Sequence, residues 1–412
     1  MTREEQAQDL MKKVKQYQLH EFRSRMPEDK QGVEFECNGV KYIAAIRRLT
    51  PTECDRLQGI PEWYDWGETS DTQHYKMDGN GWQVDTIKHC WQYLPDFGRP
   101  IRVWSLFDGM SCASITLKEL GIPVECFISS EVDKHAIAVE KKNFPNMIQV
   151  GSVTDINVRE LVDKYGVPDL LCGGSPCQSF SFSGKMKGMS TSGGEEIYTL
   201  KRYLELKEQG FQFEGQSYLF WEYMRILTEL REINPDILFF LENVKMLDKW
   251  ERVLSHAIGV RGVHINSALV CAQQRRRIYW SNIRVKNLPS PNLFGDDSNP
   301  FEWPNKETDI PQPEDRGIVI KDILQDEAAD RYYLKDETVF KLMEKTDNKK
   351  LKDYLLEPQV SVEEIVEYMN SRDECSSYSD SDKQEIATIG YELEKQRLHD
   401  RFYGKECSVL GE

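Results

Sequence analysis

From residue 101 onward, short apolar runs alternate with helical patterns, and this alternation constrains the fold more than any other feature of the chain. Five runs read as buried strands, namely 103–107, 124–129, 147–150, 169–172 and 237–241. Helical periodicity fills three of the intervals, at 111–120, 134–143 and 217–233. Such alternation predicts an α/β, doubly wound, mostly parallel Rossmann-like sheet with helices on both faces. Ligands of such sheets bind beyond the carboxyl ends of the strands.

The first hundred residues carry separate signals. Residues 1–30 predict a polar amphipathic helix that ends near Pro27. The pair Asn38-Gly39 lies between two runs of strand-forming residues and predicts a hairpin. Thr50-Pro51 predicts the start of a helix. A further helix is predicted by one apolar face, which consists of Val84, Ile87, Trp91 and Leu94.

Composition fits a globular protein inside a cell. The chain has 412 residues, of which 39% are hydrophobic and 30% charged. No apolar run approaches the roughly 18 residues of a membrane helix, and no secretory signal is expected at the polar N-terminus. The ten cysteines form no CxxC pairs and have no histidines at zinc spacing, so no metal is expected.

The net charge of −16 is unfavourable for binding nucleic acid, since phosphates attract Lys and Arg. The charge is unevenly distributed, because residues 283–412 hold 18 Lys and Arg against 30 Asp and Glu. The rest of the chain is close to neutral and has room for a local basic groove.

Polar residues follow three of the predicted strands. Phe107-Asp108-Gly109 lies between a strand and a helix, where a glycine lets a ligand approach the backbone, although an ordinary tight turn would read the same. Glu131 follows the next strand and has the right position to accept the ribose hydroxyls of an adenosyl ligand. Asp155, after the third strand, is a candidate for the adenine amino group. A solvated cap is the plainer interpretation of a carboxylate at a strand end.

A glycine-rich turn follows the fourth strand. Gly173-Gly174-Ser175-Pro176 would present Cys177 at the edge of the sheet, where a thiol is a candidate nucleophile. Most other cysteines of such a chain are expected to be small buried hydrophobes. The glycine-bearing stretch 183–194 predicts a loop able to close over a substrate.

Two further features follow the fifth strand. Glu242 ends an apolar run, and partial desolvation there suits a carboxyl group to proton donation. Arg275 and Arg277 alternate along a later strand and share one of its faces. A solvated basic edge is the plainer interpretation of these arginines.

In this order, the motifs resemble those of the cytosine-C5 DNA methyltransferase family. Phe107-Asp-Gly109 is similar to the family's first motif and Pro176-Cys177 to its nucleophile motif. Glu242-Asn-Val244 is similar to its acid motif, and Gln273-x-Arg275-x-Arg277 to its arginine motif. The resemblance implies an S-adenosylmethionine-dependent enzyme that methylates carbon 5 of cytosine in double-stranded DNA.

The resemblance also implies a role for each site residue. Cys177 would add to carbon 6 of a cytosine flipped out of the duplex, and Glu242 would protonate N3. Arg275 would hydrogen-bond O2 of the base and help hold the loop after Cys177. Arg277 of the same motif is also counted among the catalytic residues. The residues implied at the cofactor are Phe107, Asp108, Gly109, Glu131, Val132, Asp155, Ile156, Pro176, Leu219 and Asn80.

The chain departs from the family in motif order. The motifs that normally close the family's sequence, an Arg-Leu-Thr-Pro helix and a Gly-Asn motif, stand at the front, at 47–59 and 75–81. The resemblance therefore implies a circular permutant in which Gly79-Asn80 completes the cofactor pocket. The expected segments are 1–30 (helical extension), 31–98 (permuted motifs), 99–290 (catalytic domain) and 291–412 (target recognition).

Other functions remain open. A tRNA cytosine-C5 methyltransferase would share the fold, and a weakly catalytic DNA-binding or regulatory subunit would use it without the chemistry. A nicotinamide-dependent dehydrogenase would need the missing GxGxxG fingerprint, and an unrelated N-terminal domain is the alternative to permutation. Double-stranded DNA is the expected partner, with a possible cognate restriction enzyme or partner subunit and no membrane or metal. A bacterial cytoplasm or a phage-infected cell is expected rather than a nucleus.

Overall fold

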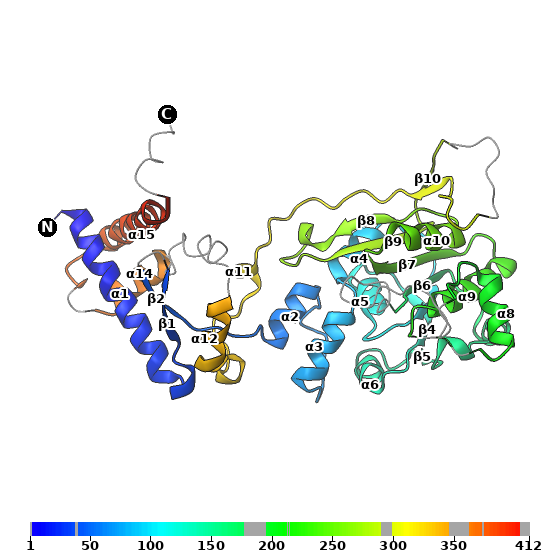
Figure 1. Cartoon of the computed structure of the whole chain (residues 1–412), viewed down its shortest axis with the longest axis horizontal. Coiled ribbons are helices and arrows are strands. Elements are labelled where there is room, and N and C mark those ends of the chain that lie inside the picture. The colour runs from blue at the N-terminus through cyan, green and yellow to red at the C-terminus, as the bar shows by residue number, and fades with distance from the viewer. Residues whose placement is uncertain are drawn as a thin grey trace. The chain divides into compact units, whose positions relative to one another are not determined.

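The computed structural model divides the chain into two compact units (Figure 1). Unit 1 combines residues 1–50 with residues 326–412, and unit 2 comprises residues 51–325. The residues that the structure describes are 2–37, 40–176, 195–211, 213, 215–289, 299–345, 362–372 and 375–403. The unit boundaries at 50/51 and 325/326 differ from the segment boundaries expected from the sequence. The roles expected of those segments stay predictions.

A seven-stranded sheet forms the centre of unit 2 (Figure 1). Its order is β5-β4-β3-β6-β7-β9-β8, with β3 to β7 parallel and β9 antiparallel to both of its neighbours. The strands are β3 (Ile101–Leu106), β4 (Val124–Ser130), β5 (Ile148–Gln149), β6 (Leu170–Gly174), β7 (Leu238–Val244), β8 (Val263–Asn266) and β9 (Arg276–Ser281). The predicted doubly wound, mostly parallel sheet is confirmed. The strands β3, β4 and β5 are added toward one edge of the sheet, and the chain then crosses back so that β6 pairs with the other side of β3. Ligands of doubly wound sheets bind beside such a switch point in strand order.

The helices of unit 2 cover the sheet or precede it in the chain. They are α2 (Pro51–Gln58), α3 (Asp71–Asn80), α4 (Val84–Trp91), α5 (Cys112–Glu119), α6 (Lys134–Asn143), α7 (Val158–Tyr165), α8 (Leu200–Glu208), α9 (Leu219–Ile233), α10 (Asp248–Ile258) and α11 (Ile320–Ile323). A small hairpin pairs β10 (Val285–Asn287) with β11 (Lys306–Thr308). The predicted helices at 111–120, 134–143 and 217–233 correspond to α5, α6 and α9.

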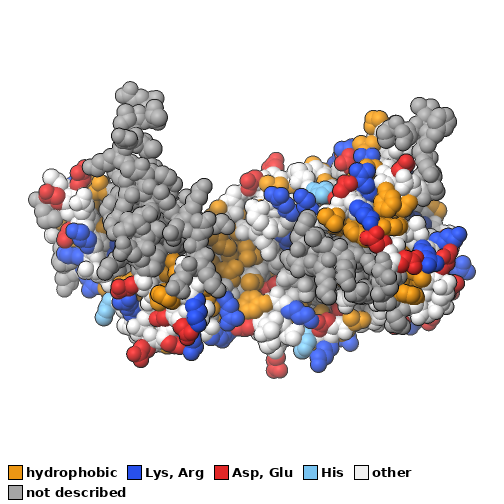
Figure 2. Space-filling model, viewed as in Figure 1, with side chains coloured by type: hydrophobic (Ala, Val, Ile, Leu, Met, Phe, Trp, Pro, Cys, Tyr) orange, Lys and Arg blue, Asp and Glu red, His pale blue; other side chains and the backbone are white. Residues whose placement is uncertain are grey.

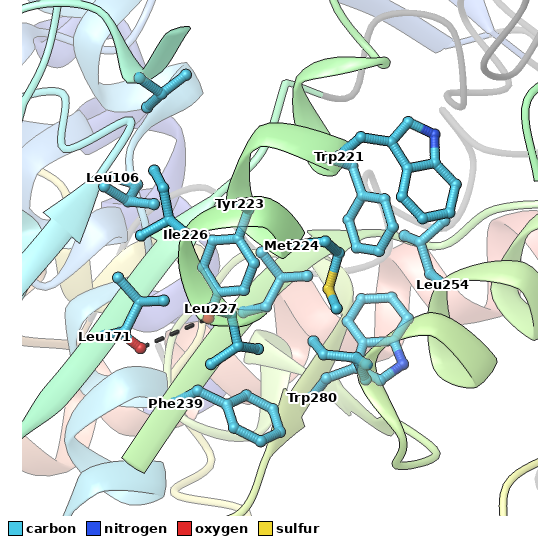
Figure 3. Packing of buried hydrophobic residues seen from close by; sticks show 14 of the residues in the cluster. Leu106, Leu171, Trp221, Tyr223, Met224, Ile226, Leu227, Phe239, Leu254 and Trp280 are labelled. Atoms are coloured by element: carbon cyan, nitrogen blue, oxygen red, sulfur yellow. Dashed lines mark hydrogen bonds between the residues drawn. The ribbon is translucent and has the colours of Figure 1, made fainter. Parts of the chain in front are cut away.

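One face of the sheet packs mainly against α9. Figure 3 shows Tyr223 and Met224 of this helix on the side of the sheet residues Phe239 and Trp280, while Trp221 of the same cluster lies beside Leu254. The Tyr223 hydroxyl donates a hydrogen bond to the Leu171 carbonyl oxygen at 3.5 Å. All of these side chains are buried. Fully burying a large apolar side chain is worth about 1.5–3 kcal/mol, so α9 anchors this face.

The other face packs against α4 and α5. Ile87 and Trp91 of α4 are fully buried and belong to one cluster with Ile101 and Val103 of β3. Of the predicted apolar stripe, Ile87, Trp91 and the partly buried Leu94 therefore pack in the cluster of the first strand, whereas Val84 belongs to a separate cluster with Met110 and Cys112. Residues 92–100 join the two elements directly, so the segment before the sheet is part of its core.

Helix α8, which precedes α9 in the chain, is held by a buried carboxylate. Glu222 is fully buried and accepts hydrogen bonds from the Tyr203 hydroxyl at 2.5 Å and from the Arg225 Nε at 2.8 Å. Lys207 also pairs with Glu222. Because losing one partner of a buried charge network is costly, these contacts attach α8 firmly to α9.

Three helices of unit 1 share one buried core. These are α1 (Arg3–Arg25), α14 (Val362–Asn370) and α15 (Asp380–Tyr403), and their buried side chains include Leu10, Val14 and Ile365. The unit also holds η1 (Glu28–Lys30), η4 (Asp330–Tyr332), α12 (Asp336–Lys345) and the hairpin of β1 (Val33–Cys37) and β2 (Val40–Ala44). The helix predicted before Pro27 and the hairpin around Asn38-Gly39 are confirmed, although the turn itself lies outside the described residues.

The visible surface of unit 2 mixes charges of both signs. Figure 2 shows basic and acidic side chains interspersed around α8 and the neighbouring end of α9. No described helix combines the length and the apolar character that crossing a membrane requires.

Candidate active site

A cavity of about 470 Å³ lies at the switch point of the sheet. It is lined from the carboxyl ends of β3, β4, β6 and β7, from the end of α3, and from Arg275 and Arg277 at the start of β9. This volume is in the range of small-molecule sites, which is roughly 300–1,000 Å³. The predicted residues that line it are Asn80, Phe107, Asp108, Gly109, Glu131, Val132, Pro176, Leu219, Glu242, Arg275 and Arg277.

The turn after β3 has an unusual backbone. Phe107, Gly109 and Ser111 all adopt left-handed conformations, with φ of 58°, 60° and 63°. For residues other than glycine such a conformation costs of order 1–3 kcal/mol and persists only where the surroundings impose it. Here the backbone N–H of Asp108 is held by the Ser130 carbonyl at 3.1 Å. A Cβ at Gly109 would meet no atom within 4 Å, so the turn presents bare backbone to the cavity.

Glu131 connects this turn to the end of β4. Its Oε2 accepts a hydrogen bond from the Gly109 N–H at 2.8 Å, and its Oε1 accepts from the N–H groups of Val132 and Asp133, each at 2.7 Å. Three backbone donors hold the carboxylate in place, while further lone pairs remain for hydroxyl donors in the cavity. The strand-end glutamate is thus a positioned acceptor rather than a solvated cap.

Asp108 and Glu140 are two buried carboxyl groups beneath the same turn. Asp108 accepts a hydrogen bond from the Ser105 hydroxyl, and its Oδ2 has no partner among the described residues. Burial raises the pKa of Asp108, and the charge of Glu131 adds to this effect while serine hydroxyls oppose it. Burial and the charge of Asp108 likewise raise the pKa of Glu140. Carboxyl groups in this state retain protons near neutral pH.

The turn after β6 needs both of its glycines. A Cβ at Gly173 would lie 2.7 Å from the Leu106 carbonyl oxygen, and one at Gly174 would lie 2.7 Å from the Trp82 Nε1 and 3.1 Å from the Glu242 Oε2. Contacts under 3 Å are sterically forbidden, so the close packing of β6 against β3 and Trp82 excludes any side chain. The two glycines of the sequence motif indicate that another part of the chain packs closely here, but the sequence does not show that Leu106 and Trp82 are the residues in contact.

Asn243 holds the same turn from the side of β7. It is buried, and its Nδ2 donates to the Ser175 carbonyl at 3.2 Å and to the Ser175 Oγ at 2.9 Å. Ser175 and Pro176 lead to Cys177, the predicted nucleophile, which lies outside the described residues together with 178–194. Asn243 therefore fixes both the backbone and the side chain of Ser175, two residues before Cys177 in the chain.

Glu242 and Arg277 form an ion pair on the cavity wall. The Arg277 Nε lies 2.9 Å from the Glu242 Oε1, and both side chains are more than four-fifths buried. Arg277 stands opposite Val244 in the antiparallel pairing of β7 with β9. Glu242 is thus its diagonal neighbour, and long side chains at this spacing reach each other across strands.

Arg275 has different partners. Its guanidinium donates to the Gly79 carbonyl at 3.3 Å and to the Gly81 carbonyl at 2.6 Å, and only 9% of the residue is exposed. The sequence predicted a contact between Arg275 and a substrate base, whereas the structure ties this side chain to the backbone after α3. It fastens the front segment of the chain to β9.

Two predicted cofactor residues do not line the cavity. Asp155 belongs to a single 3₁₀ turn, η2 (Val153–Asp155), and is exposed, while Ile156 is buried in the core of the α9 face. Ser152 and Val153 reach the cavity in their place. Because the 3₁₀ turn bends the chain after β5, the cavity is lined by Ser152 and Val153, which precede Asp155 by three and two positions.

Several lining or supporting residues escaped the sequence analysis. Trp82 and Cys112 line the cavity, and Glu140 lies beneath it. Trp82 follows Gly81 directly, so its proximity to Gly79-Asn80 was a usable signal. Glu140 lies in the middle of α6 and reads as an ordinary helical charge, so nothing in the sequence marks it.

A profile of the C-5 cytosine-specific DNA methylase family matches residues 2–94 and 101–258 of the chain. This match covers more than half of the sequence, in two segments that meet at the joint between α4 and β3. The chain belongs to the C-5 cytosine-specific DNA methylase family.

Similar proteins carry methyltransferase names. An orphan methyltransferase, M.Rho11sI of Bacillus phage rho11s, is 29% identical over 274 residues, which are 64% of this chain and 51% of that protein. DNA (cytosine-5)-methyltransferase DRM2 of Arabidopsis thaliana is 29% identical over 194 residues, 44% of this chain and 28% of DRM2. Type II methyltransferase M.HgiCI of Herpetosiphon aurantiacus is 26% identical, with 58% and 53% covered. The chain thus spans about half the length of most of these relatives, and less of DRM2.

Solved structures give weaker matches. A mutant DNMT2 of Spodoptera frugiperda has a TM-score of 0.36 at 13% identity, covering 73% of this chain and 99% of that one. The fold of this family member is defined by the strand order of its own sheet.

Proposed function

We propose that this chain transfers a methyl group from S-adenosylmethionine to carbon 5 of cytosine in DNA. The observation that carries the proposal is the composition of one cavity wall. Glu242 and Arg277 lie there beside the Gly174–Pro176 turn that leads to Cys177, opposite the bare backbone of Gly109. Family membership supplies the reaction class, and the cavity brings together motif residues as far apart in sequence as Asn80 and Arg277.

The donor side of the cavity fits an adenosyl ligand. Glu131 offers positioned lone pairs suited to ribose hydroxyls, and the buried Asp108 Oδ2 is free for a hydrogen-bond donor. Gly109 leaves open space beside the backbone, and Leu219 and Phe107 add apolar walls. S-adenosylmethionine would supply an electrophilic methyl group at this position. Since adenine would reach the end of β5, Ser152 and Val153 replace Asp155 and Ile156 as its proposed neighbours.

The acceptor side fits the handling of a cytosine ring. Cys177 is the proposed nucleophile toward carbon 6, as the family motif implies. Glu242 would hold N3 and move a proton to it, so that the ring accepts electron density from the thiolate. After methyl transfer, loss of the carbon-5 proton to a base would restore the ring and expel the Cys177 thiolate. Arg277, paired with Glu242, takes over the role that the sequence assigned to Arg275, that of a donor to O2 of the base. Arg275 then acts as a positioning residue through Gly79 and Gly81.

We further propose that the front segment is a permuted piece of the catalytic fold. Ile87 and Trp91 pack on β3, Asn80 lines the cavity, and Arg275 bonds the backbone beside it. A separate N-terminal domain would not need to share a core with the first strand. Unit 1 is left as the candidate for target recognition, with 1–50 and 326–412 contributing together.

Methyl transfer from radiolabelled S-adenosylmethionine tests the proposal. Purified full-length protein is offered duplex DNA and tRNA in competition, and bisulfite sequencing then locates the modified base. The proposal predicts label at carbon 5 of cytosine in duplex DNA, with binding that weakens steeply as salt rises. Preferential labelling of tRNA would support the RNA alternative. Binding of DNA without any label would support a regulatory subunit.

A further inference from the structure

Three chemically active side chains converge between α2 and α3, outside the cavity. They are Asp55, His74 and Asp78, and one ligand atom from each lies within 4.8 Å of the others. The His74 Nε2 lies 2.7 Å from the Asp55 Oδ1 and 3.6 Å from the Asp78 Oδ2. His74 and Asp78 are four residues apart on α3, which puts both side chains on one face of the helix.

Asp78 provides an independent sign of a missing partner. The residue is only 4% exposed, and neither of its carboxylate oxygens has a hydrogen-bond partner among the described residues. Its Oδ2 points into the cluster, toward the His74 Nε2. A buried carboxylate without a partner is costly, so this arrangement needs something to bind.

The charges of the cluster indicate what is missing. With both carboxylates ionised and His74 neutral, the cluster carries a charge of −2. Burial and the nearby Asp55 oppose this charge and raise the pKa of Asp78 to about 8, so the bare cluster holds a proton where a cation could bind. Among the described residues, His74 is the only basic side chain in contact with either aspartate. A divalent cation would bring the buried cluster to neutrality. The Trp66 ring, stacked on His74 at 3.5 Å between centroids, holds the imidazole in place and limits its contact with water.

We propose that Asp55, His74 and Asp78 form a binding site for a divalent first-row metal ion, of which Zn²⁺ is the best fit. One imidazole nitrogen with two carboxylates is a ligand set that favours such ions over Mg²⁺ or Ca²⁺, which prefer oxygen alone. The cation would take the place of the proton between His74 and Asp55. Small movements would bring all three ligands to the roughly 2.0–2.2 Å of Zn–N and Zn–O bonds.

A metal ion at this site would have a structural role, since it would hold the C-terminal end of α3 in position. None of its three ligands lines the cavity, but the adjacent residues Met77, Gly79 and Asn80 do. Clamping α3 to α2 would thereby hold one wall of the cavity. This inference depends on the cluster alone and not on the proposed methyl transfer.

Metal binding is tested on tag-free, full-length protein after EDTA treatment and dialysis. Co²⁺ is the spectroscopic probe, because it replaces Zn²⁺ and gives visible d–d absorption that depends on its ligands. We expect one equivalent of Co²⁺ or Zn²⁺ per chain and a higher melting temperature with metal than with EDTA. Asp78→Asn preserves shape and should lower Co²⁺ affinity by more than the 10–100-fold typical of losing an outer-shell partner.

A matched control separates this site from surface histidines. His264 also pairs with one carboxylate, since its Nε2 lies 2.7 Å from the Glu251 Oε1, but it is exposed. The His264→Gln variant should still bind one equivalent of metal and should show the same Co²⁺ absorption spectrum as the wild type. The proposal is overturned if wild-type protein binds no stoichiometric metal and melts equally with and without EDTA. It is also overturned if Asp78→Asn binds Co²⁺ as wild type does, or if His264→Gln removes the signal.

Discussion

The Arg277 Nε lies 2.9 Å from the Glu242 Oε1, and this ion pair lies on the wall of the cavity that Gly109 and Pro176 also line. The pair joins β7 to β9 across an antiparallel step, so it depends on the sheet rather than on neighbouring sequence. Its chemistry gives the first prediction.

Glu242→Gln should keep the shape of the wall while removing the transferable proton. Single-turnover methyl transfer should fall by about 10²–10⁴-fold, the usual worth of general acid–base catalysis, with cofactor affinity unchanged. Because the two residues act as a unit, adding Arg277→Ala should cost little more than the single change. Rates within about threefold of wild type for Glu242→Gln would remove this residue from the mechanism.

Arg275 should behave differently from Arg277. Arg275→Lys cannot donate to both the Gly79 and Gly81 carbonyls in the same geometry, because lysine lacks the planar fork of arginine. We expect weaker binding of S-adenosylmethionine and a lower melting temperature, measured by calorimetry, with Arg277→Lys as the matched comparison. If Arg275→Lys altered turnover alone and left binding intact, the positioning role would be wrong.

Stability should fall as pH rises through neutrality. The pKa of Glu140 is raised by burial in the folded protein to about 8, above its ordinary value of about 4.3. A raised folded-state pKa favours folding at low pH, and this contribution is lost between about pH 5 and pH 8. Glu140→Gln should flatten the dependence of melting temperature on pH over that window, whereas the exposed Glu208→Gln should not. Parallel pH profiles for Glu140→Gln and wild type would contradict this assignment.

The joint between α4 and β3 should tolerate cleavage. Residues 95, 96 and 98–100 are exposed, so a protease site placed there cuts the chain without disturbing the core. The cut protein should still bind cofactor, since Trp91 and Ile87 hold the front segment on β3 through buried contacts, and residues 1–50 also pack with 326–412 in unit 1. Trp91→Ala, which should cost about 3–5 kcal/mol, ought to abolish cofactor binding by the cut protein. A cut Trp91→Ala protein that binds cofactor as the uncut wild type does would indicate an independent front domain.

The sheet could be predicted because its strands have a strong local signal. Strands buried on both faces are nearly continuous apolar runs, and β3, β4, β6 and β7 all have this character. Several site residues could be predicted from their place in the predicted strands. In a doubly wound sheet the carboxyl ends of the parallel strands lie along one edge, and ligands bind there. The identity of Glu242 as a wall residue follows from its place at the end of β7.

Other features depend on contacts that leave no mark in sequence. Arg275 bonds backbone carbonyls, which every residue possesses, so its role could not be separated from that of Arg277. The one 3₁₀ turn after β5 moved Asp155 away from the cavity. Asp55, His74 and Asp78 come from two helices, and only their packing brings the third ligand into place. The association of 1–50 with 326–412 likewise depends on amphipathic faces whose partners the sequence does not specify.

Covalent trapping tests the central claim most directly. A duplex that carries 5-fluorocytosine at the target position is incubated with S-adenosylmethionine and protein, and adducts are resolved on denaturing gels. Because fluorine cannot leave as a proton does, wild-type protein should accumulate a stable adduct whose cross-linked peptide contains Cys177. Cys177→Ala should form none while still binding the cofactor. An adduct formed by Cys177→Ala, or a wild-type protein that methylates DNA without ever being trapped, would contradict the account.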